Sequence, residues 1–195
     1  MAVIYTTIEK EAHVEQLIER SRFIAHAKPV SSKEEADAFV AEIKAKYKDA
    51  THNVPAMVIG DKMQLQWGSD DGEPQGTSGA PIVQMLVKEG LTNLVVVVTR
   101  YFGGIKLGTG GLVRAYTGSA KMAIEEAGRF DVKEYVKMQV LIPYSDYDRV
   151  RYLSESEPFN IVSSSFTESV ALEIEYEKDD EKTVKNIFQD ILKKS

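Results

Sequence analysis

The chain has 195 residues, of which 43% are hydrophobic and 28% charged, an ordinary balance for a globular protein of one or two domains. It contains no cysteine, which excludes disulfides, cysteine-ligated zinc, iron–sulfur clusters and a thiol nucleophile. The net charge is −6, and the acidic excess lies in residues 131–195, which hold 14 acidic and 9 basic side chains. That part of the chain is therefore a poor candidate for contacting a phosphate backbone.

Nothing in the sequence predicts a membrane or a secretory role. The longest strongly apolar run, Leu94–Val98, is far too short to span a bilayer. The first residues, 1–10, lack the apolar stretch of a secretory signal. We therefore expect a cytoplasmic protein with no membrane partner.

The first 130 residues predict a mixed α+β domain. In chain order we expect a strand at 23–27, a helix after a Ser32–Glu35 capping box, a hairpin at 54–59 and 63–67, a helix from Ser78 to Glu89, a strand at 94–99 and a helix at about 110–127. The strand at 94–99 is β-branched at almost every position, which is typical of a strand buried on both faces.

Glycine divides the chain into two parts. All 13 glycines lie between Gly60 and Gly128, which indicates two units of different architecture, residues 1–130 and 131–195. The second unit predicts a strand at 132–142, a short helix after a Ser145–Asp148 capping box, strands at 159–166 and 170–176, and a last helix from Asp179 or Asp180. The order β-α-β-β-α is most of a ferredoxin-like fold.

A polar loop at residues 69–79 holds three carboxylates, Asp70, Asp71 and Glu73. The sequence predicts no cofactor, although hard cations prefer oxygen ligands and these side chains could hold Mg²⁺ through water. The alternative is a solvated turn whose Asp and Gly residues serve backbone geometry, which is the commoner use of such residues.

A glycine-rich segment, residues 99–112, follows the buried strand and leads into a helix. We expect Thr109 to cap that helix, with Gly110 and Gly111 in its first turn, where each glycine costs about 1 kcal/mol relative to alanine. A helix start that admits close approach, with Arg100 and Lys106 nearby, predicts an anion or phosphate cradle. The alternative is a tight turn beneath a neighbouring strand.

The same segment lies in a window without acids. Between Glu89 and Glu125 the only charged residues are Arg100, Lys106, Arg114 and Lys121. The glycines match neither the Walker nor the dinucleotide pattern, so we expect no ATP or NAD dependence. The three histidines, His13, His26 and His52, have no metal-ligand spacing.

The motifs together resemble the IMPACT family, whose bacterial members include the YigZ and YvyE proteins. The resemblance covers about residues 15–128 and rests on the segments 21–25, 50–52, 70–74, 76–79, 100–104, 107–112 and 114–116, in that order. Two positions depart from the family pattern, since Ser78 stands where we expect alanine and Met57 where we expect an aromatic residue. The second unit is similar to the small domain of the bacterial members.

The resemblance implies an architecture and a class of partner. It implies an N-terminal domain like the second domain of a small-subunit ribosomal protein, followed by a domain like a ferredoxin-like domain of elongation factor G. Its eukaryotic members restrain a starvation-responsive kinase that phosphorylates an initiation factor, by competing for the kinase's activator. The family has no established catalytic reaction.

Three functional hypotheses follow. The first is a non-enzymatic, translation-associated protein that binds RNA, the ribosome or a translation factor through Arg100, Tyr101, Gly103, Gly104, Lys106, Gly108, Thr109, Gly110, Gly111 and Arg114. The second is a Mg²⁺-dependent enzyme for a phosphorylated small molecule, with metal at Asp70, Asp71 or Glu73 and phosphate at the helix start. The third is a protein-interaction module that uses Glu173, Glu175 and Glu177.

Overall fold

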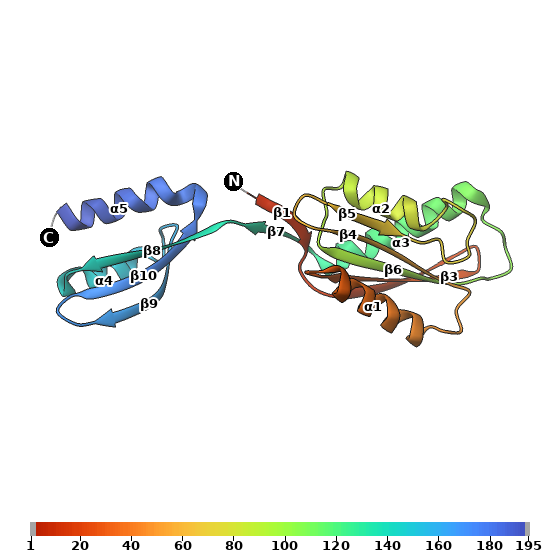
Figure 1. Ribbon diagram of the computed structural model, residues 1–195, viewed down its shortest axis with the longest axis horizontal. Coiled ribbons are helices and arrows are strands. Elements are labelled where there is room, and N and C mark those ends of the chain that lie inside the picture. Colours follow the sequence, from red (N-terminus) through yellow and green to blue (C-terminus); the bar gives the residue numbers. More distant parts are fainter. Residues whose placement is uncertain (1–2, 194–195) are drawn as a thin grey trace. The chain divides into compact units, whose positions relative to one another are not determined.

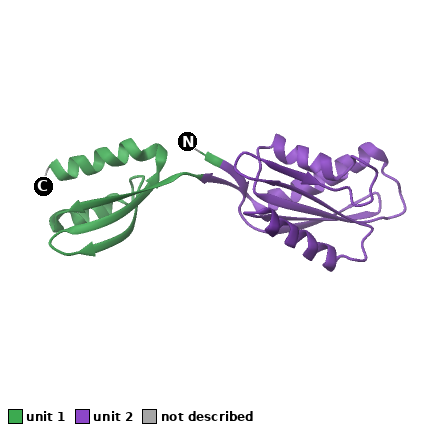
Figure 2. Cartoon of the chain, viewed as in Figure 1, with its two compact units in different colours: residues 1–4, 133–195 green, residues 5–132 purple. Residues whose placement is uncertain are grey.

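A computed structural model describes residues 3–193 and divides into two compact units, which Figure 2 colours separately. One unit is Tyr5–Val132, and the other runs from Lys133 onward and includes the residues before Tyr5. The outermost residues of the two predicted domains, 1–2 and 194–195, lie outside the described part of the chain.

The larger unit is built on a five-stranded antiparallel sheet with the order β2-β3-β6-β4-β5. The strands are β2 (Ala12–Ile18), β3 (Ser21–Pro29), β4 (His52–Ile59), β5 (Leu65–Gly68) and β6 (Leu94–Tyr101). The central strand is β6, and it is buried from Leu94 to Arg100, which confirms the prediction made from its β-branched run. A separate two-stranded sheet joins β1 (Val3–Ile8) to β7 (Arg129–Lys133).

Helices cover both faces of this sheet (Figure 1). One face carries α1 (Lys33–Lys46), which packs with Met57, Val95 and Val97. The other carries α2 (Gly79–Lys88) and α3 (Gly108–Ala127), which pack with Phe23, Val96 and Val98. Because side chains alternate across a strand, neighbouring valines of β6 serve opposite cores.

The helix ends follow the sequence only in part. Ser32 caps α1 by accepting the Glu35 amide, as predicted, whereas the Glu35 carboxylate accepts bonds from Ser31 rather than Ser32. The prediction that Thr109 caps α3 is wrong, since Leu107 occupies the N-cap position and no side chain caps that helix. Thr109 instead lies within the first turn.

The smaller unit has the predicted order β-α-β-β-α. Its elements are β8 (Tyr135–Ile142), α4 (Tyr144–Leu153), β9 (Asn160–Phe166), β10 (Val170–Glu177), the 3₁₀ turn η1 (Lys178–Asp180) and α5 (Glu181–Lys193). The strands form an antiparallel sheet with the order β8-β10-β9, the pairing of a ferredoxin-like fold without its fourth strand. The prediction of a Ser145–Asp148 capping box is wrong, because the N-cap position is Pro143, two residues earlier, and Ser145 lies within α4.

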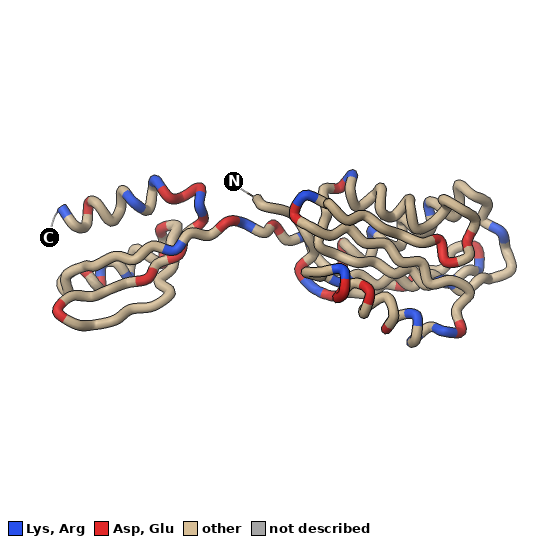
Figure 3. The backbone as a smooth tube through the Cα atoms, in the orientation of Figure 1, with Lys and Arg blue, Asp and Glu red and all other residues tan. Residues whose placement is uncertain are grey.

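One face of the smaller sheet forms the second core. Alternate residues of β10, Leu172 and Ile174, pack with Val150 of α4 and with Val184 and Phe188 of α5. The other face carries Glu173, Glu175 and Glu177, the residues of the interaction-module hypothesis. Lys137 pairs with Glu173 and Lys133 pairs with Glu177. Basic and acidic positions are interspersed over this unit (Figure 3), so the acidic face is partly neutralised.

No helix among residues 3–193 is long and apolar enough to cross a membrane.

His26 of β3 makes the larger unit sensitive to acid. Its ring is buried between His13 and Tyr47, with ring centroids 5.9 and 5.1 Å away, and its Nε2 is sealed without a partner among the described residues. Burial, and then the charges of His13 and Lys46, lower the pKa of His26 from 6.5 to about 4. Between these two pKa values, the unfolded chain therefore binds a proton at His26 that the folded chain does not bind.

We predict that the free energy of unfolding falls by roughly 1–3 kcal/mol as the pH drops from the ordinary histidine pKa of 6.5 toward the lowered pKa of about 4. Above pH 6.5, His26 should make no further contribution to the pH dependence. Urea denaturation at closely spaced pH values measures the loss, and His26→Phe should flatten the profile. An equally steep profile in His26→Phe would assign the acid sensitivity to other groups.

Candidate functional site

Asp70 acts as the cap of helix α2. Its carboxylate accepts hydrogen bonds from the backbone amides of Gly76, Ser78 and Gly79 at 2.8–3.1 Å, and from the Ser78 hydroxyl at 2.8 Å. Burial alone would raise the pKa of Asp70, but the four hydrogen bonds outweigh burial and lower it. Ser78 stands at the N-cap position as predicted, yet its side chain donates to Asp70 instead of capping the helix.

The other two acids of the loop face different partners. Asp71 bonds to Lys44 at 2.6 Å and to the Asn53 amide at 2.7 Å, while Glu73 turns into the protein interior. The described residues contain no group of three or more His, Asp or Glu side chains placed to hold a metal ion. Each of the three carboxylates thus has its own set of partners, and the Mg²⁺ role of these residues stays a prediction.

Glu73 joins the acidic loop to the glycine-rich segment. Its Oε1 accepts from Arg100 Nη1 at 2.6 Å and from the Tyr116 hydroxyl at 2.7 Å. His52 Nε2 lies 3.6 Å from the same oxygen, and its Nδ1 lies 2.8 Å from the Asp71 carbonyl. Since a carbonyl only accepts, Nδ1 carries the hydrogen and donates to Asp71, and Nε2 is the ring nitrogen nearer to Glu73.

Arg100 is buried in this network. Its side chain is 5% exposed, its guanidinium lies over the rings of Phe23 and Phe102 at 5.4 and 5.3 Å, and Nη2 donates to Ser21. Its Nε is sealed without a hydrogen-bond partner among the described residues. A side chain held in this way is not available to an RNA backbone, which argues against the predicted contact role of Arg100.

Tyr101, also predicted as a contact residue, is half-buried. Its hydroxyl donates to Asp49 at 3.0 Å, and the Arg22 guanidinium lies 5.6 Å from the ring centroid. Phe102, the next residue, is 46% exposed. The aromatic side chain available for stacking on a base is therefore Phe102 rather than Tyr101.

The glycines of the segment serve different needs. A Cβ on Gly103 would lie 2.0 Å from the Arg20 carbonyl oxygen, so Gly103 permits a close packing of two turns. Gly110 has no such requirement, because a Cβ there would meet only the Arg114 guanidinium, at 3.5 Å. The predicted tight turn thus explains why residue 103 is glycine. It does not explain Gly110, where the first turn of α3 has room for a larger side chain.

Two hollows flank residues 105–108. We call the first the Glu73 pocket; its volume is about 410 Å³ and it is lined by Thr51, His52, Glu73, Pro74, Arg100, Phe102, Lys106, Leu107, Gly108, Thr109 and Leu112. We call the second the Arg114 groove; its volume is about 600 Å³ and it is lined by Gln16, Ile18, Glu19, Ile105, Lys106, Leu107, Gly111, Arg114, Ala115, Gly118 and Met122. Lys106 and Leu107 line both.

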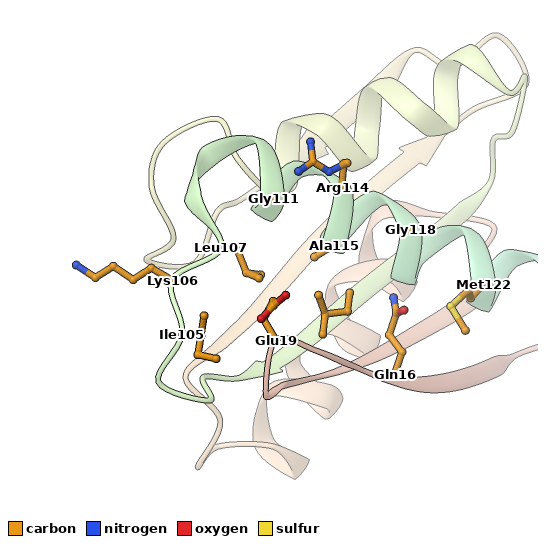
Figure 4. Close-up of a pocket in the computed structure, with 11 residues that line it drawn as sticks. Gln16, Glu19, Ile105, Lys106, Leu107, Gly111, Arg114, Ala115, Gly118 and Met122 are labelled. Atoms are coloured by element: carbon orange, nitrogen blue, oxygen red, sulfur yellow. The ribbon is translucent and has the colours of Figure 1, made fainter.

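The Arg114 groove runs between the β2–β3 turn and helix α3 (Figure 4). Within the described residues, neither Lys106 nor Arg114 has a hydrogen bond or ion pair from its side chain. By contrast, Lys121 pairs with Glu89 at 2.6 Å. Glu19 is the one carboxylate that lines the groove. The acid-free window of the sequence therefore supplies two unpaired cations at this site.

Sequence reasoning missed several residues of both hollows. In the sequence, Tyr116 looked like an ordinary core residue of α3, and His52 looked like a histidine without partners. Gln16 and Glu19 lay outside every predicted element. Their roles depend on contacts between distant segments, such as the 2.7 Å bond from Tyr116 to Glu73. The spacing of the residues along the chain carried no signal for such contacts.

Comparisons with known proteins agree along most of the chain. The family model described as the Impact N-terminal domain matches residues 19–124, and a domain of unknown function, DUF1949, matches residues 140–192. The IMPACT family member YvyE of Bacillus subtilis is 44% identical over 143 residues, which are 73% of this chain and 64% of YvyE. The match thus spans less than two thirds of that relative.

Longer and structural matches extend the comparison. An IMPACT family member of Haemophilus influenzae is 35% identical over 184 residues, which are 93% of this chain and 87% of the relative. A crystal structure described as that of a hypothetical protein has a TM-score of 0.63 and 31% identity, and the match covers 90% of this chain and 86% of the other.

We predict that Asp70→Ala lowers the free energy of unfolding by about 2 kcal/mol, because it leaves the start of α2 without its cap. Asp70→Asn keeps one carbonyl oxygen for the amides and should lose clearly less. Because the pKa of Asp70 is lowered, this stabilisation is present above the ordinary aspartate pKa and is lost as the pH falls through the lowered value. Chemical denaturation at neutral and acidic pH compares the three proteins.

We predict that Arg100→Met destabilises the larger unit by about 3–5 kcal/mol, because it leaves the Glu73 carboxylate buried without its cation. Adding Glu73→Gln removes the stranded charge and should recover part of the loss. A double-mutant cycle measured by denaturation gives the coupling energy. Strictly additive losses would show that the pair does not act as a unit.

Proposed function

The chain belongs to the IMPACT family, and we propose that it is a non-enzymatic, translation-associated protein that binds ribosomal RNA through the Arg114 groove. The observation that carries the proposal is the pair of unpaired cations, Lys106 and Arg114, beside the uncapped amino end of α3. Arg114 Nη1 lies 3.5 Å from the position of a Cβ on Gly110, so the guanidinium stands at that helix end. A phosphate placed there meets both a cation and free amides.

The charge of the chain restricts the kind of RNA. With a net charge of −6, the protein repels a phosphate backbone except where basic residues cluster. Glu19, which lines the groove, adds a further restriction, because its negative charge repels an unstructured RNA strand that passes through the groove. A folded RNA that presents phosphates only to Lys106 and Arg114 satisfies both conditions. This favours a structured target such as the ribosome over bare single strands.

The family resemblance supports the same class of partner. It implies domains like those of a ribosomal protein and an elongation factor, and a regulatory role in initiation for eukaryotic members. The divergent carboxylates of the acidic loop give no comparable support to a Mg²⁺-dependent enzyme, since Asp70 is engaged by four donors and Glu73 by two.

We predict that the protein sediments with ribosomes at about 50 mM salt and less at about 200 mM salt, as expected for phosphate contacts. Lys106→Ala with Arg114→Ala should abolish most of the pelleting at low salt. In a titration with ribosomal RNA fragments, the double variant should lower the slope of log affinity against log salt by about 2.

The matched control is Lys62→Ala with Lys88→Ala, which removes the same charge from two exposed lysines of the same unit. It should pellet like the wild type. Wild-type pelleting by the Lys106 and Arg114 variant would place the RNA contact elsewhere. No pelleting of the wild type at low salt would overturn the proposal itself.

We predict opposite effects of Gly110→Ala on stability and on binding. Alanine should raise the free energy of unfolding by up to about 1 kcal/mol, because Gly110 is helical and a Cβ there has room. The added methyl group should weaken ribosome binding by crowding the approach to the first-turn amides. Thermal unfolding and the pelleting assay are measured on the same preparation. A stabilised variant that pellets like the wild type would show that no ligand approaches this turn.

A further inference from the structure

We propose that the Glu73 pocket binds a nucleoside monophosphate unit, either as a free nucleotide or as a nucleotide of a single-stranded RNA end. The site differs from the Arg114 groove, since Glu73, His52 and Phe102 line only the pocket. The two proposed sites share Lys106 and the amino end of α3, and they differ in the other groups that they use: Arg114 for ribosome binding, and Glu73 and Phe102 for the pocket. The volume of the Glu73 pocket, about 410 Å³, is within the range of roughly 300–1,000 Å³ that small-ligand sites occupy.

The first argument is an open acceptor on a buried acid. The Glu73 side chain is 4% exposed, and Arg100 and Tyr116 both bond to its Oε1. Its Oε2 has no hydrogen-bond partner among the described residues. Among the described residues, the fully buried side-chain atoms without a partner are His26 Nε2 and Arg100 Nε. Glu73 Oε2 is not one of them, so it keeps some accessible surface, and Glu73 lines the pocket. Because an unsatisfied acceptor on a buried carboxylate is unfavourable, a ligand that donates a hydrogen bond to Oε2, such as a ribose hydroxyl or a base N–H, would be stabilised there.

The second argument is an anion site at the opposite wall. Gly108 and Thr109, the first residues of α3, line the pocket, and no side chain caps that helix. Their amides are therefore left without intrahelical partners. Lys106, whose side chain forms no ion pair among the described residues, lines the same pocket. Helix α3 has 20 residues, so its amino end presents a full dipole to a phosphate.

The third argument is the apolar surface between these two polar walls. Pro74, Phe102, Leu107 and Leu112 line the pocket, and Phe102 is 46% exposed. An exposed aromatic ring on a pocket wall offers a stacking face for a planar base. A ligand that fits all three features has an anionic group, a hydroxyl or amine donor, and a flat apolar part. A nucleoside monophosphate unit has these three groups in one molecule.

The test is isothermal titration calorimetry of the full chain with AMP, GMP, CMP and UMP, and with a short single-stranded RNA that carries a 5′-phosphate. Inorganic phosphate and adenosine are the fragment controls. We expect at least one mononucleotide or the oligonucleotide to bind, and both fragments to bind at least ten-fold more weakly. Binding of the free nucleotides identifies a small-molecule source, and binding of the oligonucleotide alone identifies an RNA end; either supports the proposal.

Phe102→Leu separates this pocket from other sites. Loss of base stacking should weaken nucleotide binding by about 5- to 150-fold. The matched control is Phe130→Leu, which changes a phenylalanine of similar exposure, 50%, outside both hollows and should bind like the wild type. Circular dichroism melting of both variants shows that they remain folded. Phe102 does not line the Arg114 groove, so Phe102→Leu should still sediment with ribosomes like the wild type, which keeps this proposal distinct from the proposed function.

NMR amide shifts locate the ligand. On addition of nucleotide, the amides of Gly108 and Thr109 should shift, and those of the smaller unit should not. The proposal is overturned if no nucleotide or oligonucleotide binds, if Phe102→Leu binds as tightly as the wild type, or if inorganic phosphate binds as tightly as the nucleotides. The last result would mean that the helix end binds anions without recognising a nucleoside.

Discussion

The larger unit depends on one buried ion pair, between Arg100 at the end of β6 and Glu73 in the loop before α2. Both charges are almost fully removed from water, so each requires the other. Tyr116 adds a second donor from α3, and burial together with the Glu73 hydrogen bond raises the pKa of this tyrosine. The pair thereby links the central strand, the acidic loop and helix α3 at one point, and the Glu73 pocket forms beside that point.

Much of the fold follows from local sequence signals. The β-branched run of β6, the alternating residues of β10 and the Ser32 cap each state their structure within a few neighbours, and each prediction is confirmed. Strands β1 and β2 were not predicted. In β2 the exposed residues His13, Glu15 and Leu17 alternate with Val14, Gln16 and Ile18, which are only half-buried, so each face mixes polar and apolar residues. The failed caps at Thr109 and Ser145 show the limit of local signals, since the backbone entered each helix before the polar residue.

The site was less predictable than the fold for a physical reason. Residue types indicated that segments 69–79 and 99–112 carry chemistry, but not that they meet, because their contact spans 27 positions and is decided by the sheet order. Burial then reassigns the side chains. From the sequence alone Arg100 looks like a surface cation, whereas in the structure it is buried against Glu73. Asp70 looks like a metal ligand, whereas in the structure it accepts hydrogen bonds from three backbone amides. The sequence identifies the charged side chains, but only the tertiary structure shows which of these charges are paired with an opposite charge.

Leu107 and Lys106 form a thin partition with one side in each hollow. Any displacement of this partition that enlarges one hollow narrows the other, because the two share the same wall. A ligand that displaced this wall from one hollow would change the affinity of the other hollow, and such coupling is reciprocal: each ligand would change the affinity for the other by the same factor. Two residues in one wall of the larger unit would thus make the capture of one ligand conditional on the presence of another.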